Sequence, residues 1–284
     1  NLPDGEESSM TATTTMSSGK VRWPLPTGLG IAASCAFIFV VAPLIVVAGA
    51  ALNAEAMFFP PRQLTLHWMI AALTEGSFVN GALISFVVAA VAAMVSTLFA
   101  LPVALQLRKA PPAVARILTL SFMGPLLVPS VIFALALYSV MMYAFGVTNL
   151  FILMIGHVII TMPYPVRTIT AVTEHLDPAL EDAASSVGAS PWRTFVSVTL
   201  PLIKPGVIAG FLFAFITSWN DFSISVFLTP RELQPLPIKI YEYLLFQYRP
   251  IIAAVSTWSV IGSAIIVLII DRLVGLNVFT GRRA

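Results

Sequence analysis

The side chains that could do chemistry are few and widely spaced in this chain. The sequence contains no G-x-x-x-x-G-K-[ST] phosphate-binding loop, no G-x-G-x-x-G dinucleotide motif and no H-E-x-x-H metal motif. His67, His157 and His175 are too scattered to predict a metal site, and the one cysteine, Cys35, excludes an internal disulfide. The ionisable side chains within the long apolar segments are His157 and Asp221. We therefore predict no catalytic residue and no metal ligand, and a chain that cannot hydrolyse ATP alone.

The composition is that of an integral membrane protein rather than of a soluble domain. Of the 284 residues, 58% are hydrophobic and 10% are charged, whereas a soluble domain carries about 25% charged residues. The mean hydropathy is +0.93. The net charge of +2 is too small to argue for nucleic-acid binding. Disordered, collagen-like and disulfide-stabilised classes are excluded for the bulk of the chain.

Six apolar segments are long enough to cross a bilayer, which requires a helix of about 20 residues. The uncharged stretch 117–166 is too long for one helix, and the cluster 145–149 predicts a tight turn that divides it. Pro125 and Pro129 are expected to bend the first of the two resulting helices. An all-α fold with six transmembrane helices follows, at about 29–52, 79–106, 117–143, 150–166, 205–230 and 251–270. The polar stretch 230–249 predicts a loop outside the membrane with a short amphipathic helix.

Six spans place both termini on one side of the membrane, and the basic residues indicate which side. Of the 15 Lys and Arg residues, eleven lie on the terminal side and the other four on the opposite side. Since positive residues are retained inside, we expect both termini to be cytoplasmic. We expect a polar, disordered tail at 1–28, a six-span domain at 29–275 and a cytoplasmic tail at 276–284. The first span exceeds the ~7–15 apolar residues of a signal peptide, so an anchor is expected.

The cytoplasmic loop between the fourth and fifth spans has clear helix signals. Asp177 is a good N-cap and Pro178 a good first residue, so a helix begins there. Its residues 180, 183, 184 and 187 recur on one face, and Gly188 ends it. Ser190-Pro191 repeats the start signal for a second short helix, with apolar contacts from 192 and 195. The loop therefore predicts a short helix-turn-helix with a smooth face suited to the groove of another protein.

This loop resembles the EAA loop of ABC importer permeases. The family pattern is Glu-Ala-Ala, three residues, Gly, nine residues and Ile-x-Leu-Pro. The segments 182–184, 188 and 198–201 match it, with Asp in place of Glu and Val in place of Ile. The resemblance implies a type I ABC importer permease whose coupling loop, at about 177–197, docks into a cleft of a cytoplasmic ATPase. The coupling residues that it implies are Glu181, Asp182, Ala183, Ala184, Gly188, Leu200 and Pro201.

The same resemblance implies a set of partners and a cellular location. The partners are a second permease subunit, expected to be a different chain, two cytoplasmic ATPase subunits and an extracytoplasmic solute-binding protein. The chain would lie in the lipid of the bacterial inner membrane and would have no nucleic-acid partner. It would bind no cofactor itself, because ATP and Mg would be bound by the partner ATPase. ATP binding and hydrolysis would then drive alternating access of the pore.

Several further segments are similar to permeases for spermidine and putrescine, namely 123–130, 156–157, 211–215, 218–222 and 236–241. Permeases for aminoethylphosphonate, opines and other small nitrogenous solutes share much of this pattern. A polyamine is therefore the preferred solute, with these others as alternatives. A membrane enzyme and a passive channel are weaker alternatives. An enzyme would need paired ionisable groups at one depth, and a channel would have no use for the coupling loop.

A substrate pathway is predicted at Trp219, Asn220, Asp221 and Phe222. Asp221 is the one carboxylate within a predicted span, and such groups normally face a bundle interior or a water-filled path. On a continuous helix, Trp219 and Phe222 share one side with Asp221 between them. Their rings would add cation–π contacts of about 0.5–2 kcal/mol each to a passing amine. The structural alternative is that Asp221 pairs with an Arg of a partner subunit or caps a break in the span. His157 is expected to be a packing histidine with satisfied hydrogen bonds rather than a proton carrier.

Overall fold

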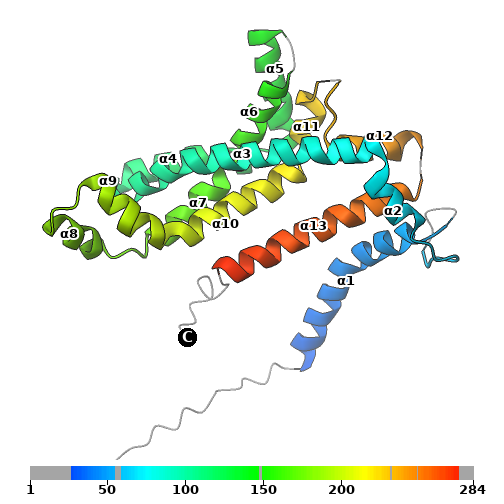
Figure 1. Cartoon of the computed structure of the whole chain (residues 1–284), viewed down its shortest axis with the longest axis horizontal. Helices are drawn as coiled ribbons and strands as arrows, with labels where there is room; N and C mark the ends of the chain where they lie inside the picture. Colours follow the sequence, from blue (N-terminus) through cyan, green and yellow to red (C-terminus); the bar gives the residue numbers. More distant parts are fainter. Residues whose placement is uncertain (1–26, 55–58, 147–148, 231, 248, 275–284) are drawn as a thin grey trace, which may run out of the picture. The chain divides into compact units, whose positions relative to one another are not determined.

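The regular structure of the chain is helical. The computed structural model describes residues 27–54, 59–146, 149–230, 232–247 and 249–274, and no β-strand occurs among them. Residues 1–43 and 44–284 form two separate units. The described part of the first unit is the beginning of helix α1 (Thr27–Ala51), and the second unit contains the other helices (Figure 1). The predicted tail at 276–284 and nearly all of that at 1–28 lie outside the described residues.

The helices of the second unit follow one another with short connections. In chain order they are α2 (His67–Thr74), α3 (Gly76–Lys109), α4 (Pro112–Leu127), α5 (Ser130–Phe145), α6 (Leu150–Thr161), α7 (Pro163–Thr173), α8 (Pro178–Ser186), α9 (Pro191–Thr194), the π-helical η1 (Phe195–Thr199), α10 (Leu200–Trp219), α11 (Ser223–Leu228), α12 (Leu236–Phe246) and α13 (Ile251–Val274).

Five helical segments of the described residues are long and apolar enough to cross a membrane. They are Gly30–Ala51, Gly76–Lys109, Leu150–Thr173, Pro191–Trp219 and Ile251–Ile269. The first, second and sixth predicted spans therefore agree with the structure to within a few residues. The fourth continues through α7 to Thr173, well beyond its predicted end at 166, because Pro163 begins α7 in line with α6.

The third predicted span is the main departure from expectation. It forms two helices, α4 and α5, which are bent by 101° at their junction, so the predicted bend at Pro129 is confirmed, but the chain breaks there instead of continuing as one helix. The cause is Pro129, which lacks an N–H and forces Val128 before it into an extended conformation (φ −103°, ψ 135°). A sixth span exists if this pair is counted as one. The predicted helix end within 145–149 is confirmed, since Gly146 ends α5 with φ +70°.

The core that positions the rest is the packing of α10 against α3 and α7, which lie side by side in Figure 1. Small buried side chains of α3, including Ala100 and Ala104, meet apolar residues of α7 and α10. Gly206 and Gly210 let α10 approach α7 closely. A Cβ at 210 would lie 2.6 Å from the Cα of Pro165, which is backbone and cannot move aside easily. Small residues at such contacts are the usual means of close helix packing in membranes.

A second cluster ties α2, α12 and α13 to the beginning of α3. Buried Phe78 packs there with Leu236 and Ile251. Ser85 on α3 accepts a hydrogen bond of 2.8 Å from the backbone N–H of Leu236, which satisfies a donor at the start of α12. The predicted short helix within 230–249 is thus confirmed as α12, and it is anchored to the second apolar span.

The close approach of α10 to α7 yields a stability prediction. Gly210→Ala is expected to destabilise the protein by about 1–3 kcal/mol, because the added methyl group overlaps the backbone of Pro165. Gly262→Ala, on α13, is the matched control, since nothing lies within 4 Å of its added methyl. Thermal unfolding of the purified protein in detergent measures both. Equal melting temperatures for the two variants would contradict the tight contact.

Candidate functional site

The coupling loop folds as its local signals predict. A side-chain oxygen of Asp177 accepts a hydrogen bond of 2.9 Å from the N–H of Ala179 and caps α8. Gly188 follows α8 with φ +83°, in the left-handed region that favours glycine. Ser190 caps α9 through the N–H of Arg193 at 3.4 Å. One feature differs from expectation, because α9 is not a separate short helix. It continues through η1 directly into α10, so the loop is joined to a membrane-spanning helix without a break.

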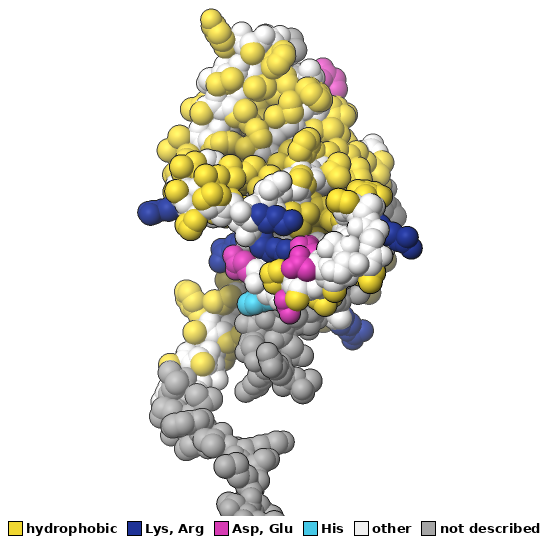
Figure 2. Space-filling view, turned by 90° about the vertical axis from the view of Figure 1, so that its left-hand side faces the viewer, with side chains coloured by type: hydrophobic (Ala, Val, Ile, Leu, Met, Phe, Trp, Pro, Cys, Tyr) yellow, Lys and Arg dark blue, Asp and Glu magenta, His cyan; other side chains and the backbone are white. Residues whose placement is uncertain are grey.

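The apolar side chains of this loop are presented outward. Leu180 is 46% exposed, Val187 84% and Trp192 72%. No residue of α8 or α9 is buried. Figure 2 views the molecule from this end and shows acidic and basic side chains gathered around the loop, beside the apolar surface of the body. Exposed apolar side chains with a polar rim are typical of protein–protein contact surfaces.

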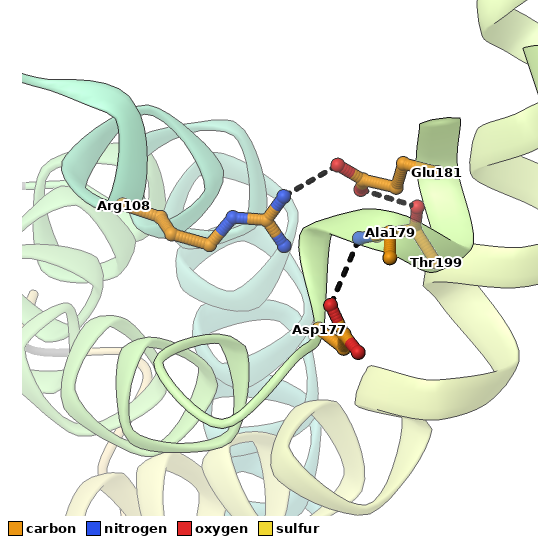
Figure 3. A network of polar contacts seen from close by, with 5 residues as sticks. All are labelled: Arg108, Asp177, Ala179, Glu181 and Thr199. Carbon is orange, nitrogen blue, oxygen red and sulfur yellow. Dashed lines mark hydrogen bonds and ion pairs between the residues drawn. The ribbon is translucent and has the colours of Figure 1, made fainter. Parts of the chain in front are cut away.

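Glu181 does not belong to this outward surface. Its carboxylate accepts hydrogen bonds from the guanidinium of Arg108, with which it also forms an ion pair, and from the hydroxyl of Thr199 at 2.8 Å (Figure 3). Arg108 lies in the last turn of α3, and Thr199 is the buried last residue of η1. Glu181 was expected to contact the ATPase, but the structure directs its side chain to two other elements of its own chain.

The electrostatics keep this carboxylate ionised. Partial burial by itself raises the pKa of Glu181. The hydrogen bonds from Thr199 and Arg108, together with the positive charges of Arg108 and Lys109, lower it by more, so the pKa is below its usual range. A depressed carboxyl pKa means that the ionised form is present at neutral pH and is lost only on strong acidification. The contact with Arg108 is therefore intact throughout the physiological range.

The other predicted coupling residues lie in two places. Asp182 and Ala183 are exposed on α8, Ala184 is half-buried, and Gly188 is exposed after the helix. Leu200 and Pro201 are the first residues of α10 and so belong to the spanning helix rather than to the loop. A cleft of about 540 Å³ separates α8 from the end of α3, and it is lined by residues that include Arg108, Lys109, Glu181 and Asp182.

Arg108 and Thr199 were not predicted as site residues. Arg108 entered only the charge count, and Thr199 only the matched Val-Thr-Leu-Pro segment.

A second candidate site lies at the far end of α10. The predicted fifth span was one helix through 230, but α10 ends at Trp219 and α11 begins at Ser223. Asp221 accepts a hydrogen bond of 2.7 Å from the N–H of Ile224, so it caps α11. The argument that placed Trp219, Asp221 and Phe222 by continuous helical spacing is therefore wrong. Of the two structural alternatives, the structure shows the cap at a break.

Three of the four predicted pathway residues nevertheless meet at one cavity. Trp219, Asn220 and Phe222 line a space of about 400 Å³ between the end of α10, α12 and α13. The ring of Phe222 lies 5.0 Å from that of Tyr241, measured between centroids. Asp221 is adjacent in sequence but is not among the lining residues. The hydroxyl-bearing residues that line the cavity were missed by sequence reasoning: Tyr241, Ser256 and Ser259. Tyr241, on α12, ends the matched segment 236–241 but was not singled out, and no motif marks Ser256 or Ser259 on α13.

His157 is a packing histidine, as expected. It is buried in α6, with Nδ1 2.8 Å from the hydroxyl of Ser218 and Nε2 3.2 Å from the hydroxyl of Ser225. Both ring nitrogens are thus satisfied, one by α10 and one by α11. The imidazole joins the two sides of the break at Asp221.

A family model for the binding-protein-dependent transport system inner membrane component matches residues 96–278, which include the coupling loop and the break. The chain belongs to this family. The family match and the fold together make this permease a type I ABC importer subunit, which takes part in transport rather than catalysis, with the ATPase as a separate subunit.

Curated relatives carry several solute names. The permease is 31% identical over 185 residues to a putative ABC transporter permease, ORF1, of Streptomyces antibioticus, covering 65% of this chain and 81% of that protein. It is 24% identical to the spermidine/putrescine transport system permease protein PotC of Escherichia coli, covering 82% of this chain and 88% of that one. It is 36% identical over 89 residues to the molybdenum transport system permease protein ModB of Haemophilus influenzae, covering 30% and 39%. The last match spans well under two thirds of the relative.

Solved structures show the same fold. A bacterial ABC transporter that imports the acidic polysaccharide alginate matches with a TM-score of 0.67 and 17% identity, over 87% of this chain and 95% of that one. An inward-facing MetNI methionine ABC transporter matches with a TM-score of 0.57 and 19% identity, over 69% and 94%. At these identities the likeness concerns the fold alone, and it confirms the all-α, multi-span architecture.

Proposed function

We propose that this permease is one half of the translocation pore of an ATP-driven importer for polyamines or related small amines. Its partners are a second permease chain, different from this one, two cytoplasmic ATPase subunits that bind ATP and Mg, and an extracytoplasmic solute-binding protein. Both termini lie in the cytoplasm, the tails are 1–28 and 276–284, and 29–275 forms the pore domain. The observation that carries the proposal is the outward apolar face of the coupling loop on a chain of this family.

The coupling role follows from what the loop offers and how it is attached. Val187 and Trp192 expose large apolar surfaces that no residue of this chain covers within the described structure. A partner groove that accepts α8 would bury these side chains and contact Asp182, Ala183 and Ala184 beside them. Since α9 and η1 continue into α10, displacement of the loop by the closing ATPase is passed to a spanning helix. This arrangement supports alternating access driven from the cytoplasmic side.

The cavity at Trp219 supports an amine as the solute. Aromatic rings of Trp219, Phe222 and Tyr241 line it together with serine hydroxyls, and these groups attract ammonium through cation–π contacts and hydrogen bonds. Among the described residues that line it there is no Lys or Arg to bind an anion. The PotC likeness covers 82% of this chain and the ModB match 30%, which favours polyamines over a molybdenum compound. Aminoethylphosphonate and opines, which also bear amino groups, are the next candidates.

Uptake into proteoliposomes tests the proposal directly. The vesicles hold this chain with its co-purified permease and ATPase partners and the solute-binding protein, and the panel is putrescine, spermidine, an opine, aminoethylphosphonate and a neutral sugar. We expect ATP-dependent uptake of the two polyamines. ATP-dependent uptake of another solute alone would keep the importer and overturn the polyamine assignment. Uptake that ignores ATP would overturn the importer itself.

Charge placed on the apolar face of α8 should separate docking from insertion. Val187→Asp is expected to abolish ATP-driven uptake and recovery of the ATPase with the permease, because a carboxylate would be buried without a partner. The side chain makes few internal contacts, so insertion and melting temperature should not change. Ser185→Asp is the matched control, since it adds the same charge to an exposed position on the other side of the helix. Normal ATPase recovery with Val187→Asp would contradict docking through this face.

The charge of Asp221 can be removed without removing the cap. Asn caps helices about as well as Asp, so Asp221→Asn should retain the hydrogen bond to Ile224 and the melting temperature. If the negative charge draws a cationic amine into the adjacent cavity, polyamine uptake falls several-fold while the complex still assembles. Asp221→Ala should lower both uptake and stability. Full uptake by Asp221→Asn would limit Asp221 to its capping role.

A further inference from the structure

Helix α8 must be held in place by something other than apolar burial. None of its residues is buried, and its apolar side chains point outward. Its cap at Asp177 and the hydroxyl contacts of Ser185 and Ser186 are all made within the same short segment. Among the described residues, Glu181 provides the side-chain hydrogen bonds that join α8 to other helices. The position of α8 therefore depends on one carboxylate.

The two contacts of this carboxylate reach different parts of the membrane domain. Arg108 lies in the last turn of α3, a helix of 34 residues with many buried side chains along its length. Thr199 is buried in η1, immediately before α10. The segment η1 is π-helical, a rare and wider geometry that occurs often at functional sites. One oxygen of Glu181 thus binds the α3 side and the other binds the α10 side (Figure 3).

We propose that Glu181 is a positioning residue that transmits movement of the coupling helix to α3 and α10 together. This inference rests on the proposed coupling function, and it names the side-chain contacts through which movement of α8 would reach the spanning helices. Without the carboxylate, α8 keeps its backbone connections, to α7 through residues 174–177 and to α10 through α9 and η1, but it loses its direct side-chain link to α3. With it, displacement of α8 moves the α3–α10 pair as one body, since these helices pack closely along their length. The neighbouring carboxylate of Asp182 is exposed and stays available to the ATPase.

Loss of Glu181 should produce a different defect from loss of an outward residue. A change at an outward residue such as Val187 should reduce the amount of ATPase that is recovered with the permease. Glu181→Gln should leave the complex assembled and ATP hydrolysis active, because the outward face is unchanged. The amount of solute imported per ATP hydrolysed should fall by about tenfold, since a charged hydrogen bond to Arg108 is lost. A merely structural role would lower assembly and leave that ratio unchanged.

The experiment measures this ratio in the proteoliposomes described above. The variants are Glu181→Gln, Arg108→Glu, and Glu181→Arg combined with Arg108→Glu, with Glu174→Gln as the control for loss of an exposed carboxylate. We expect Glu181→Gln and Arg108→Glu to lower the solute imported per ATP hydrolysed and the control to match the wild type. The exchanged pair should recover much of the wild-type value. A wild-type ratio in Glu181→Gln, or an exchanged pair no better than the single changes, would overturn the link.

A second variant covers the case in which Glu181→Gln prevents assembly. Thr199→Val removes one hydroxyl and keeps both the shape of the side chain and the ion pair with Arg108. This variant should assemble, and its ratio of solute imported to ATP hydrolysed should fall partway. A wild-type ratio in this variant would overturn the proposal that Glu181 links α8 to α10 as well as to α3. The wild type separates this inference from the proposed function. If wild-type uptake does not depend on ATP, the importer proposal fails. If wild-type uptake depends on ATP and the variants keep the wild-type ratio, the link alone fails.

Discussion

The close contact between α10 and α7 is the constraint on which the rest of the structure depends. Gly206 and Gly210 have no side chains there, and the backbone of α7 takes up the space that a Cβ would need. In a bilayer, apolar surface gains little by leaving lipid for protein, so helices associate through such close packing and through buried polar contacts. The contact holds α10 in one orientation along α7 and α3. One candidate site, the loop at 177–197, lies at the beginning of α10, and the other, the aromatic cavity, lies at its end.

Each end of α10 departs from regular α-helix in a way that suits its position. At the beginning, the π-helical turn joins it to α9 and places Thr199 within reach of Glu181. At the other end, the chain breaks at Asn220 and Asp221, and α11 starts again with a carboxylate cap. His157 bonds to a serine on either side of that break. The helix α10 thus connects the loop at 177–197 at its beginning with the aromatic cavity at its end.

Polar groups in the membrane domain are scarce, and the structure uses them at these joints. A buried polar side chain without a hydrogen-bond partner is costly in a bilayer. This explains why His157 forms hydrogen bonds with Ser218 and Ser225. The side chains of Glu181 and Arg108 are partly exposed, so their ion pair forms at a modest desolvation cost. The apolar face of α8 is the exception, because its exposed side chains have no partner among the residues that the structure describes. It is consistent with a protein whose working form is an assembly.

The sequence by itself determined the membrane class, the approximate spans, the caps of α8 and α9 and the position of the helical loop at 177–197. These features depend on composition, on local periodicity and on residues such as Asp177, Gly188 and Ser190 that act on their own backbone. It could not place the break after Trp219, since one carboxylate in an apolar run fits a pathway or a cap equally well. Only the tertiary structure decided that Asp221 caps α11, that Val128 and Pro129 turn the chain by 101°, and that Glu181 binds Arg108 and Thr199. The bond between Glu181 and Arg108 joins groups 73 residues apart, and no local pattern contains that information. At Asp221 and Pro129 a local signal was present, but it allowed more than one outcome, and only the folded chain shows which one occurs.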